Sequence, residues 1–338
     1  QLFARVLAVL LIGALCLSAQ GATWYVDDVT DPLEDGSVSH PFDAIQEGLS
    51  AATNGDTVLI LDGVYSGPGN RDLDPAGKSI TIESESGASN AIIDCQSAGR
   101  GFIFRSGETT NCRISGLRIC NGNTLVGAGI ACFSNSCPVI EGCEIVSNRA
   151  WTYYYTIVIG SPGDPYYSVG NVADGRGGGI YCEDSGPTLR GCVVERNETG
   201  GEGGGICSVS NSSLSVEDCL IIGNRAALSC TNIIETVNTP ADPYYRLTWT
   251  TKAGGQGGGI YSHAGSLTAS NCEITANSAG FGGGGYILSN STLRLEDCQI
   301  RGNSALDNSA PAVGGGLAVI KGSAQIIGCS VNSNDAGG

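Results

Sequence analysis

The 338-residue sequence has no methionine, two histidines, and only 17 lysines and arginines against 33 aspartates and glutamates. Because methionine is missing even at position 1, we expect that the sequence lacks its own start. A net charge of −16 argues against a nucleic-acid-binding protein, which needs a basic face. The two histidines, His40 and His263, lie far apart in the chain, and we find no metalloprotease, nucleophile-elbow or phosphate-loop motif. The sequence therefore gives little support for catalysis.

Proline is also scarce, with 11 residues, whereas glycine reaches 52. Collagen is excluded because it needs abundant proline and a glycine at every third position. Long helices are not expected, since glycine loses the most backbone entropy on folding. Disorder is not expected either, because 41% of the residues are hydrophobic and Ile, Val and Leu recur along the chain. The composition therefore predicts a folded protein built without long helices.

Long apolar runs are missing apart from Val6 to Leu17, which follows the single charge of Arg5. This run is too short to span a bilayer, which needs about 20 residues. The small residues up to Ala22 fit a cleavage site, so we predict that residues 1–22 are an export signal. A buried apolar helix is the alternative, and lipidation of Cys16 is not expected because Leu15 precedes it. The mature chain is then secreted or held at the outer cell surface, with no transmembrane segment.

Six segments repeat one template around a cysteine. Each has an apolar residue three positions before the cysteine, an asparagine five positions after it, and a glycine cluster such as Gly177-Gly178-Gly179-Ile180 upstream. The cysteines are Cys143, Cys192, Cys219, Cys272, Cys298 and Cys329, and the asparagines are Asn148, Asn197, Asn224, Asn277, Asn303 and Asn334. Uninterrupted repeats are about 26 residues long, and apolar and polar residues alternate within them. Short strands, sharp turns and this period predict a parallel β-solenoid, an all-β fold.

Stacking of identical coils explains both repeated residues. The asparagines can form an amide ladder that links each coil to the next. A catalytic or glycosylated asparagine is the alternative, and the glycosylation pattern occurs at Asn197, Asn211 and Asn290. In-register cysteines have Cβ atoms about 4.8 Å apart, further than a disulfide prefers, so we expect buried thiols. Outside this ladder Cys132 and Cys137 could pair, and no zinc spacing appears, so no metal site is expected from thiolates.

The ends of the solenoid differ from its middle. Residues 23–56 contain a short strand and an amphipathic helix, Pro41 to Ala52, which we expect to cover the open first coil. Residues 57–338 then form a parallel β-helix of about nine coils. The sequence stops in the beginning of another glycine-rich turn, so we expect the C-terminus to be truncated.

Two family resemblances rest on these motifs. The helix followed by Gly55-Asp56-Thr57-Val58 and a β-solenoid resembles the right-handed parallel β-helix, pectate-lyase-like superfamily. The glycine clusters before Ile and the Ile-x-x-Asn segments are similar to the repeats of polymorphic outer membrane proteins, which have Gly-Gly-Ala-Ile and Phe-x-x-Asn. The first resemblance implies a right-handed β-helix and lyase or hydrolase relatives. The second implies an adhesin-like surface protein.

Two insertions, residues 149–176 and 225–256, separate the asparagine from the glycine cluster on alternate coils. They should leave the same corner and rise side by side, and both contain Asp-Pro-Tyr-Tyr. The candidate binding residues in them are Trp151, Tyr153, Tyr154, Tyr155, Asp164, Tyr166, Tyr167, Asp242, Tyr244, Tyr245 and Trp249. We interpret these aromatics as a wall that binds glycans or cell-surface proteins. The alternative is that the insertions pack on each other as a small satellite core.

Two functions follow. The first is a structural, adhesive or glycan-binding module outside the cell, and the second is a carbohydrate-active enzyme, a polysaccharide lyase or glycoside hydrolase. Asp184, Glu202 and His263 lie near the glycine-rich strands, but isolated polar residues there are more typical of a solvated surface. No catalytic residue is assigned. No cofactor is expected, although the acidic residues could hold Ca²⁺.

Overall fold

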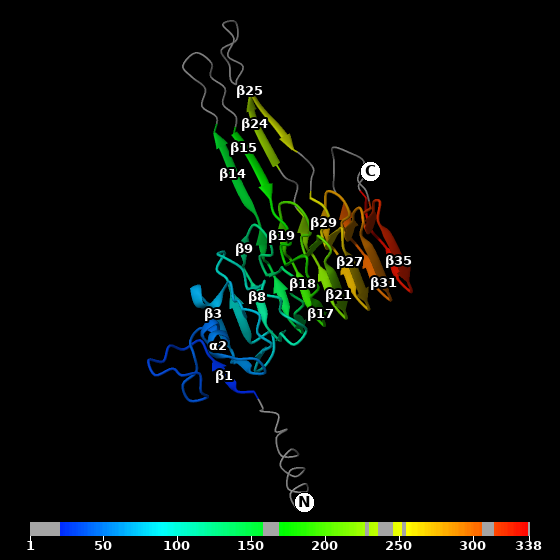
Figure 1. The fold of residues 1–338 in the computed structure, drawn as a ribbon. Helices are drawn as coiled ribbons and strands as arrows, with labels where there is room; N and C mark the ends of the chain where they lie inside the picture. Colours follow the sequence, from blue (N-terminus) through cyan, green and yellow to red (C-terminus); the bar gives the residue numbers. More distant parts are fainter. Residues whose placement is uncertain are drawn as a thin grey trace, which may run out of the picture.

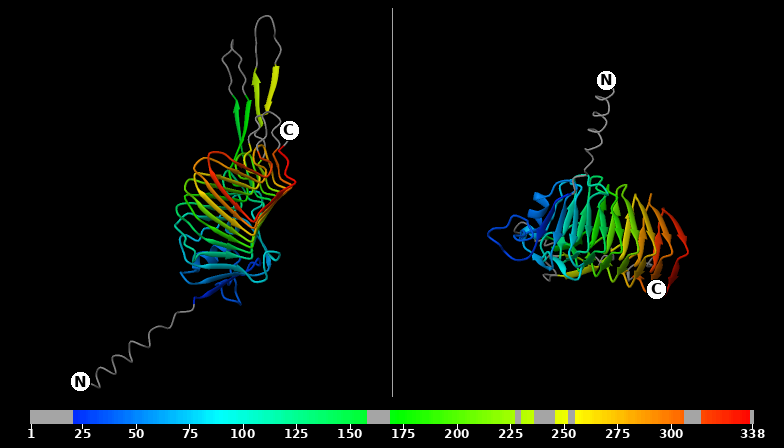
Figure 2. Two further views of the ribbon diagram at one scale, coloured as in Figure 1. Left: turned by 90° about the vertical axis from the view of Figure 1, so that its right-hand side faces the viewer. Right: turned by 90° about the horizontal axis from the view of Figure 1, so that it is seen from below.

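The computed structural model describes residues 21–157, 169–226, 230–235, 246–251, 255–305 and 314–336. In residues 152–157, 169–174, 230–235 and 246–251 only the backbone is described. Within these ranges the chain winds into a stack of coils that runs in sequence order from the blue to the red end (Figures 1 and 2). Every strand of the stack pairs in parallel with its neighbours on the coils before and after it. The predicted all-β parallel β-helix is therefore confirmed.

Each coil passes through up to four strands, and each strand adds to one of four sheets. The ten-stranded sheet contains β1 (Thr23–Val26), β2 (Thr57–Ile60), β4 (Thr81–Ser84), β7 (Arg113–Ser115), β11 (Val139–Glu141), β17 (Thr188–Arg190), β21 (Ser213–Glu217), β27 (Ser266–Ser270), β31 (Thr292–Glu296) and β35 (Ser323–Ile327). The nine-stranded sheet contains β3 (Gly63–Ser66), β5 (Ala91–Asp94), β8 (Arg118–Cys120), β12 (Glu144–Val146), β18 (Val193–Glu195), β22 (Leu220–Ile222), β28 (Glu273–Thr275), β32 (Gln299–Arg301) and β36 (Ser330–Asn332).

Two shorter sheets complete each coil. The six-stranded sheet, at the corner that bears the asparagines, contains β9 (Asn123–Thr124), β13 (Arg149–Ala150), β19 (Glu198–Thr199), β23 (Arg225–Ala226), β29 (Ser278–Ala279) and β33 (Ser304–Ala305). The seven-stranded sheet contains β6 (Phe102–Phe104), β10 (Ile130–Cys132), β16 (Ile180–Glu183), β20 (Ile206–Val209), β26 (Ile260–His263), β30 (Gly285–Ile287) and β34 (Leu317–Val319).

The core follows from the alternation of residues along these strands. In β17 the side chain of Leu189 is fully buried, and it pairs in register with Ile140 on the coil before and Val216 on the coil after. Such columns continue along the stack and form one core cluster. A coil has no core of its own, so its apolar side chains are buried only because the neighbouring coils cover them.

The six repeated asparagines form a hydrogen-bonded column inside the corner of the six-stranded sheet. The Oδ1 atom of Asn224 accepts the backbone N–H of Asn197 at 2.9 Å and its side-chain amide at 3.0 Å. The Nδ2 atom of Asn224 donates to the carbonyl oxygen of Val194 at 2.8 Å and to Oδ1 of Asn277 at 3.0 Å. The same pattern recurs from Asn148 to Asn334. Each amide side chain thus bonds main-chain and side-chain groups on adjacent coils.

The glycine clusters lie where the chain passes from the six-stranded to the seven-stranded sheet. At Gly204 a Cβ atom would stand 2.5 Å from the backbone carbon of Arg225 on the next coil. Its neighbour Gly203 has a φ of +66°, which side chains disfavour. The turn therefore needs glycine both for its backbone conformation and for the close approach of adjacent coils.

A short helix, α2 (Ile45–Ala51), lies at the N-terminal end of the stack (Figure 1). It packs on β1 and β2 with Ile45 and Leu49 buried, and the 3₁₀ helix η1 (Pro68–Asn70) lies beside it. The helix is shorter than the span predicted from Pro41, because Phe42 instead bridges to Val26 as extended backbone beside β1. That α2 serves as a cap stays a prediction.

The asparagine column leads to a test of stability. Replacing Asn224 by alanine would leave buried main-chain and amide groups without partners, so we expect the free energy of unfolding to fall by about 3 kcal/mol. The matched control is Asn90→Ala, since Asn90 is exposed and its side-chain nitrogen bonds only the carbonyl oxygen of Ser86, at 3.3 Å. We expect the control to change stability by less than about 0.5 kcal/mol. Urea unfolding measures both, and equal losses would contradict the proposed role of the column.

Candidate functional site

The two long insertions each contain an antiparallel β-hairpin. The first pairs β14 (Thr152–Ile157) with β15 (Val169–Asp174), and the second pairs β24 (Cys230–Glu235) with β25 (Arg246–Thr251). Both rise from the same edge of the stack (Figures 1 and 2), and Cα atoms of β15 and β24 come within 8 Å of one another. The expected side-by-side arrangement therefore holds for the described parts of both insertions.

The structure describes only some of the predicted aromatic binding residues. Tyr153, Tyr154 and Tyr155 lie in β14, and Trp249 lies in β25, where only the backbone is described. Trp151 precedes β14, and the guanidinium carbon of Arg149 lies 5.3 Å from the centre of its ring. The remaining residues lie outside the described part of the chain: Asp164, Tyr166, Tyr167, Asp242, Tyr244 and Tyr245. A shared aromatic wall stays a prediction.

A row of five residues runs along the foot of the hairpins, each bridged in parallel to the next. In coil order the row consists of Val126, Arg176, Glu202, Gln256 and Phe281. Arg176 follows β15 by two residues, and Gln256 follows the second hairpin. All five side chains are partly exposed. Since adjacent coils stand about 4.8 Å apart, the row is roughly 19 Å long.

Behind the row, a cluster of tyrosines covers the outer face of the seven-stranded sheet. Tyr181, Cys207, Tyr261 and Tyr286 occupy one register position on successive coils and are at most 7% exposed. The rings of Tyr261 and Tyr286 stack with centroids 6.2 Å apart, and Phe281 lies against Tyr286 at 6.3 Å. The partly buried Phe133, Leu288 and Ile320 flank the cluster.

The charged members of the row lie beside the tyrosine hydroxyls of this cluster. The Nε atom of Arg176 lies 2.8 Å from a carboxylate oxygen of Glu202. The hydroxyl of Tyr181 donates to Glu183 at 3.2 Å, Arg176 lies beside that hydroxyl, and Glu202 lies beside the hydroxyl of Tyr261. Burial raises the pKa of both tyrosines, so their hydroxyls stay protonated. The two charged side chains therefore pair with each other beside neutral tyrosine hydroxyls.

Of these residues only Glu202 is singled out in the sequence, where no role is assigned to it. The sequence does contain a pattern that could have identified the tyrosines, because Tyr181 and Tyr261 each follow directly after the Ile of a glycine cluster. Arg176 and Glu202 each stand immediately before such a cluster. Asp184 and His263, which the sequence analysis names together with Glu202, lie at the C-terminal ends of β16 and β26, away from the row. The repeat positions alone do not show which of these side chains lie close together.

A cavity of about 280 Å³ opens at one end of the row. Leu125, Val126, Gly175 and Arg176 line it, next to the base of the first hairpin. Leu125 is 41% exposed, so part of the lining is apolar and open to solvent. The row thus begins at a partly apolar hollow and ends at the Phe281 ring.

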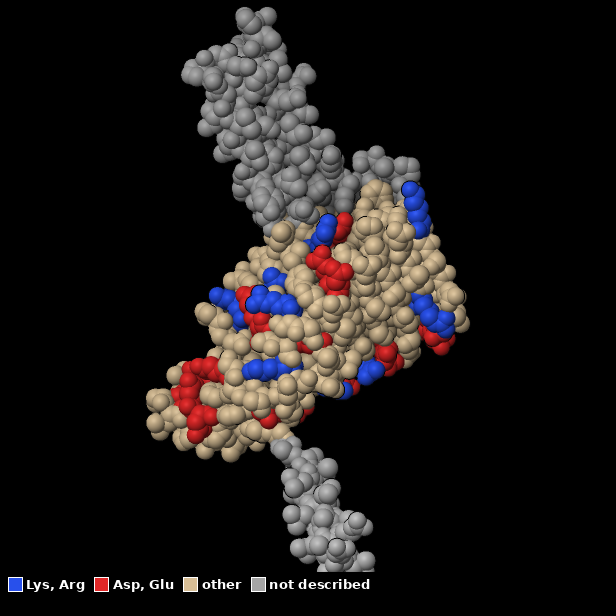
Figure 3. Space-filling view, in the orientation of Figure 1, with Lys and Arg blue, Asp and Glu red and all other residues tan. Residues whose placement is uncertain are grey.

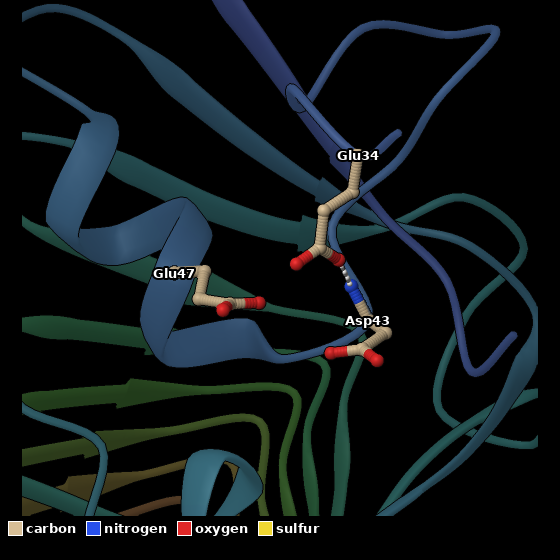
Figure 4. A group of neighbouring side chains, drawn as sticks. All are labelled: Glu34, Asp43 and Glu47. Atoms are coloured by element: carbon tan, nitrogen blue, oxygen red, sulfur yellow. Dashed lines mark hydrogen bonds between the residues drawn. The ribbon is translucent and has the colours of Figure 1, made fainter. Parts of the chain in front are cut away.

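Three carboxylates gather at the opposite, N-terminal end of the molecule. One oxygen atom from each of Glu34, Asp43 and Glu47 lies within 4.8 Å of the others (Figure 4). The backbone N–H of Asp43 donates to Glu34 at 3.0 Å, and burial together with the neighbouring acids raises the pKa of Glu47. These residues could supply oxygen ligands, but exposed acidic groups often occur without an ion. Calcium binding stays a prediction.

The family described as right-handed beta helix region matches residues 63–239, more than half of the chain, so this protein belongs to the right-handed β-helix family. No curated protein sequence matches it. Among the described residues, no helix is long and apolar enough to cross a membrane.

Solved structures with a similar fold include two lyases and a glycosidase. Pectate lyase Pel9A has a TM-score of 0.48 and 12% identity over 93% of this chain and 79% of its own. A rhamnogalacturonan lyase has a TM-score of 0.39 and 13% identity, over 85% and 74%. The GH136 lacto-N-biosidase from Eubacterium ramulus has a TM-score of 0.41 and 12% identity, over 92% and 68%. Likenesses this distant say nothing about activity.

The repeated cysteines line the interior, and all cysteines whose side chains are described are free thiols, Cys132 and Cys137 included. The thiol of Cys272 donates to the carbonyl oxygen of Val216 at 3.5 Å, and the backbone N–H of Cys192 donates to the sulfur of Cys219 at 3.3 Å. Burial raises the pKa of Cys143 to about 12. The described ladder thiols thus fill the core and bond the backbone of adjacent coils.

This burial predicts how the thiols react. In the native protein at pH 8 we expect fast modification by an aromatic disulfide reagent only at Cys137 and Cys329 among the described cysteines, because the others are buried. Denaturant should expose the rest. Mass spectrometry of the labelled peptides identifies each modified cysteine. It also distinguishes Cys16 and Cys230, whose side chains the structure does not describe, from the other cysteines. Fast labelling of Cys192 or Cys219 in the native state would contradict the buried ladder.

Proposed function

We propose that this protein is exported and acts outside the cell as a β-helical module that binds glycans along its hairpin-bearing edge. The observation that supports the proposal is the row of hydrogen-bonding and aromatic side chains at the foot of two adjacent hairpins. Arg176, Glu202 and Gln256 offer donors and acceptors in line, and Phe281 offers an aromatic ring at the end. Sugars present many hydroxyl groups and apolar ring faces, which such a surface complements.

The composition of the hairpins supports the same proposal. Their sequences concentrate tyrosine and tryptophan next to the row, whereas the stack below them is rich in small and aliphatic residues. Tyr and Trp provide large contact areas with a polar edge at little entropic cost. A long ligand could lie along the row and contact the side of the two hairpins at the same time. Export follows from the signal predicted at residues 1–22, and a structural or adhesive role in a cell surface is compatible with this binding.

The proposal is tested by Tyr166→Ala combined with Tyr244→Ala. If the hairpins bind glycans, the variant should bind a polysaccharide that is a ligand of the unaltered protein about tenfold more weakly or worse. The reason is that aromatic contacts at an interface centre are worth about 1–2 kcal/mol or more. The melting temperature should stay the same. Isothermal titration and differential scanning calorimetry measure the two properties separately. The matched control is Tyr25→Ala, which removes a partly exposed tyrosine from β1 at the other end of the stack. A lower melting temperature with unchanged binding would show that the hairpins only pack on each other.

A carbohydrate-active enzyme is the second candidate, and one observation favours it. The network places two carboxylates, Glu183 and Glu202, on one face through Tyr181 and Arg176. Glycosidic bond cleavage commonly uses two carboxyl groups, one as an acid and one as a base or nucleophile. If this protein is such an enzyme, incubation with a bound polysaccharide should release new reducing ends, and Glu183→Gln should reduce the rate by a factor of 100 or more. Binding without any release of reducing ends would rule out hydrolysis at this face.

A further inference from the structure

We propose that the row at the foot of the hairpins selects an extended glycan without charge. This inference rests on the proposed function and adds the chemical class of the ligand. The only formal charges in the row belong to Arg176 and Glu202, which lie 2.8 Å apart and cancel. The other three members are an amide, an aromatic ring and an aliphatic side chain. The row therefore offers hydrogen bonds and apolar contacts but no net charge to a ligand.

The rest of the described surface has few free cations with which to hold a polyanion. Where side chains are described, every arginine but Arg71 takes part in an ion pair. Near the hairpins, Glu198 pairs with both Arg149 at 2.8 Å and Arg225 at 3.3 Å, and this group retains one positive charge. In Figure 3 blue atoms lie next to red ones at several places on the stack, and a group of red atoms without blue neighbours lies at the N-terminal end. With a net charge of −16 as well, the protein should repel an acidic polysaccharide.

The geometry of the row suits a linear neutral chain. Its five positions follow the solenoid axis over roughly 19 Å, from the 280 Å³ cavity at Val126 to the ring of Phe281. Arg176 and Glu202 are 47% and 25% exposed, so they retain hydrogen-bonding capacity on the solvent side. Their mutual ion pair of 2.8 Å orients both groups, and the buried Tyr181 and Tyr261 lie beside them. Hydrogen bonds from such charged groups to hydroxyls are stronger than neutral ones, and the prior orientation lowers the entropic cost of binding.

The experiment uses the full chain and four soluble probes. Xyloglucan and galactomannan are neutral, and polygalacturonate and alginate are acidic. By affinity electrophoresis and titration calorimetry, the unaltered protein should bind a neutral probe and neither acidic one. Glu202→Gln keeps the side-chain size but leaves Arg176 unpaired. It should weaken neutral binding about tenfold and create binding of polygalacturonate that declines as salt is added.

The matched control is Glu217→Gln, which frees Arg190 from an ion pair of 2.9 Å on the ten-stranded sheet and should leave neutral binding unchanged. Gln256→Ala disturbs no ion pair and should also weaken neutral binding, and calorimetry on each variant verifies folding. If the unaltered protein prefers the acidic probes, or if Glu217→Gln acts like Glu202→Gln, the inference is wrong while glycan binding stands. If none of the four probes binds, the proposed function fails together with the inference.

Discussion

The column of buried asparagines is the interaction on which the rest of this structure depends. A solenoid must turn sharply at each corner, and the turn leaves main-chain groups inside that no strand can pair. A buried group without a partner costs about 1–3 kcal/mol. Asn224 and its counterparts meet these groups with both polar atoms of their side-chain amides, and Asn224 bonds the coils on both sides. Because the amides must stack in register, they also fix the number of residues that each corner can hold.

This constraint explains where the chain can lengthen. On the uninterrupted coils, the path from the asparagine to the glycine cluster is short and its backbone bonds the adjacent coils. The first hairpin interrupts that path after Ala150 and returns to it at Gly175, and both ends keep their bonds: Gly200 donates to Ala150, and Glu202 donates to Gly175. The extra residues therefore leave the stack without shifting its register. Differences in length between the coils are therefore confined to one edge of the molecule. The residues beside that edge are the ones best placed to bind a ligand.

Much of the fold could be predicted from the sequence because its determinants are local and repeated. The spacing of Cys192, Asn197 and the next glycine cluster recurs, and alternation separates inside from outside. The tyrosine cluster could not be predicted in this way. Alternation places Tyr181 on the outer face of its strand, but it does not show that Tyr181 is buried there or that Arg176 lies beside it. Its link to Tyr261 and Glu202 crosses coils, and only the register of the sheets reveals it. The predicted start of the N-terminal helix at Pro41 was wrong for a similar reason, because Phe42 pairs with Val26, which is distant in sequence.

The direction of the backbone bonds has a mechanical consequence. In the four parallel sheets these bonds run along the stack, from each coil to the next. A pull on the two ends loads the coil interfaces in series, so the weakest interface opens first and the others stay intact. A pull across the stack loads many strands at once, in shear. If the hairpin edge were held by an extracellular polymer while the chain is anchored elsewhere, the coils would yield one at a time and dissipate the force in steps.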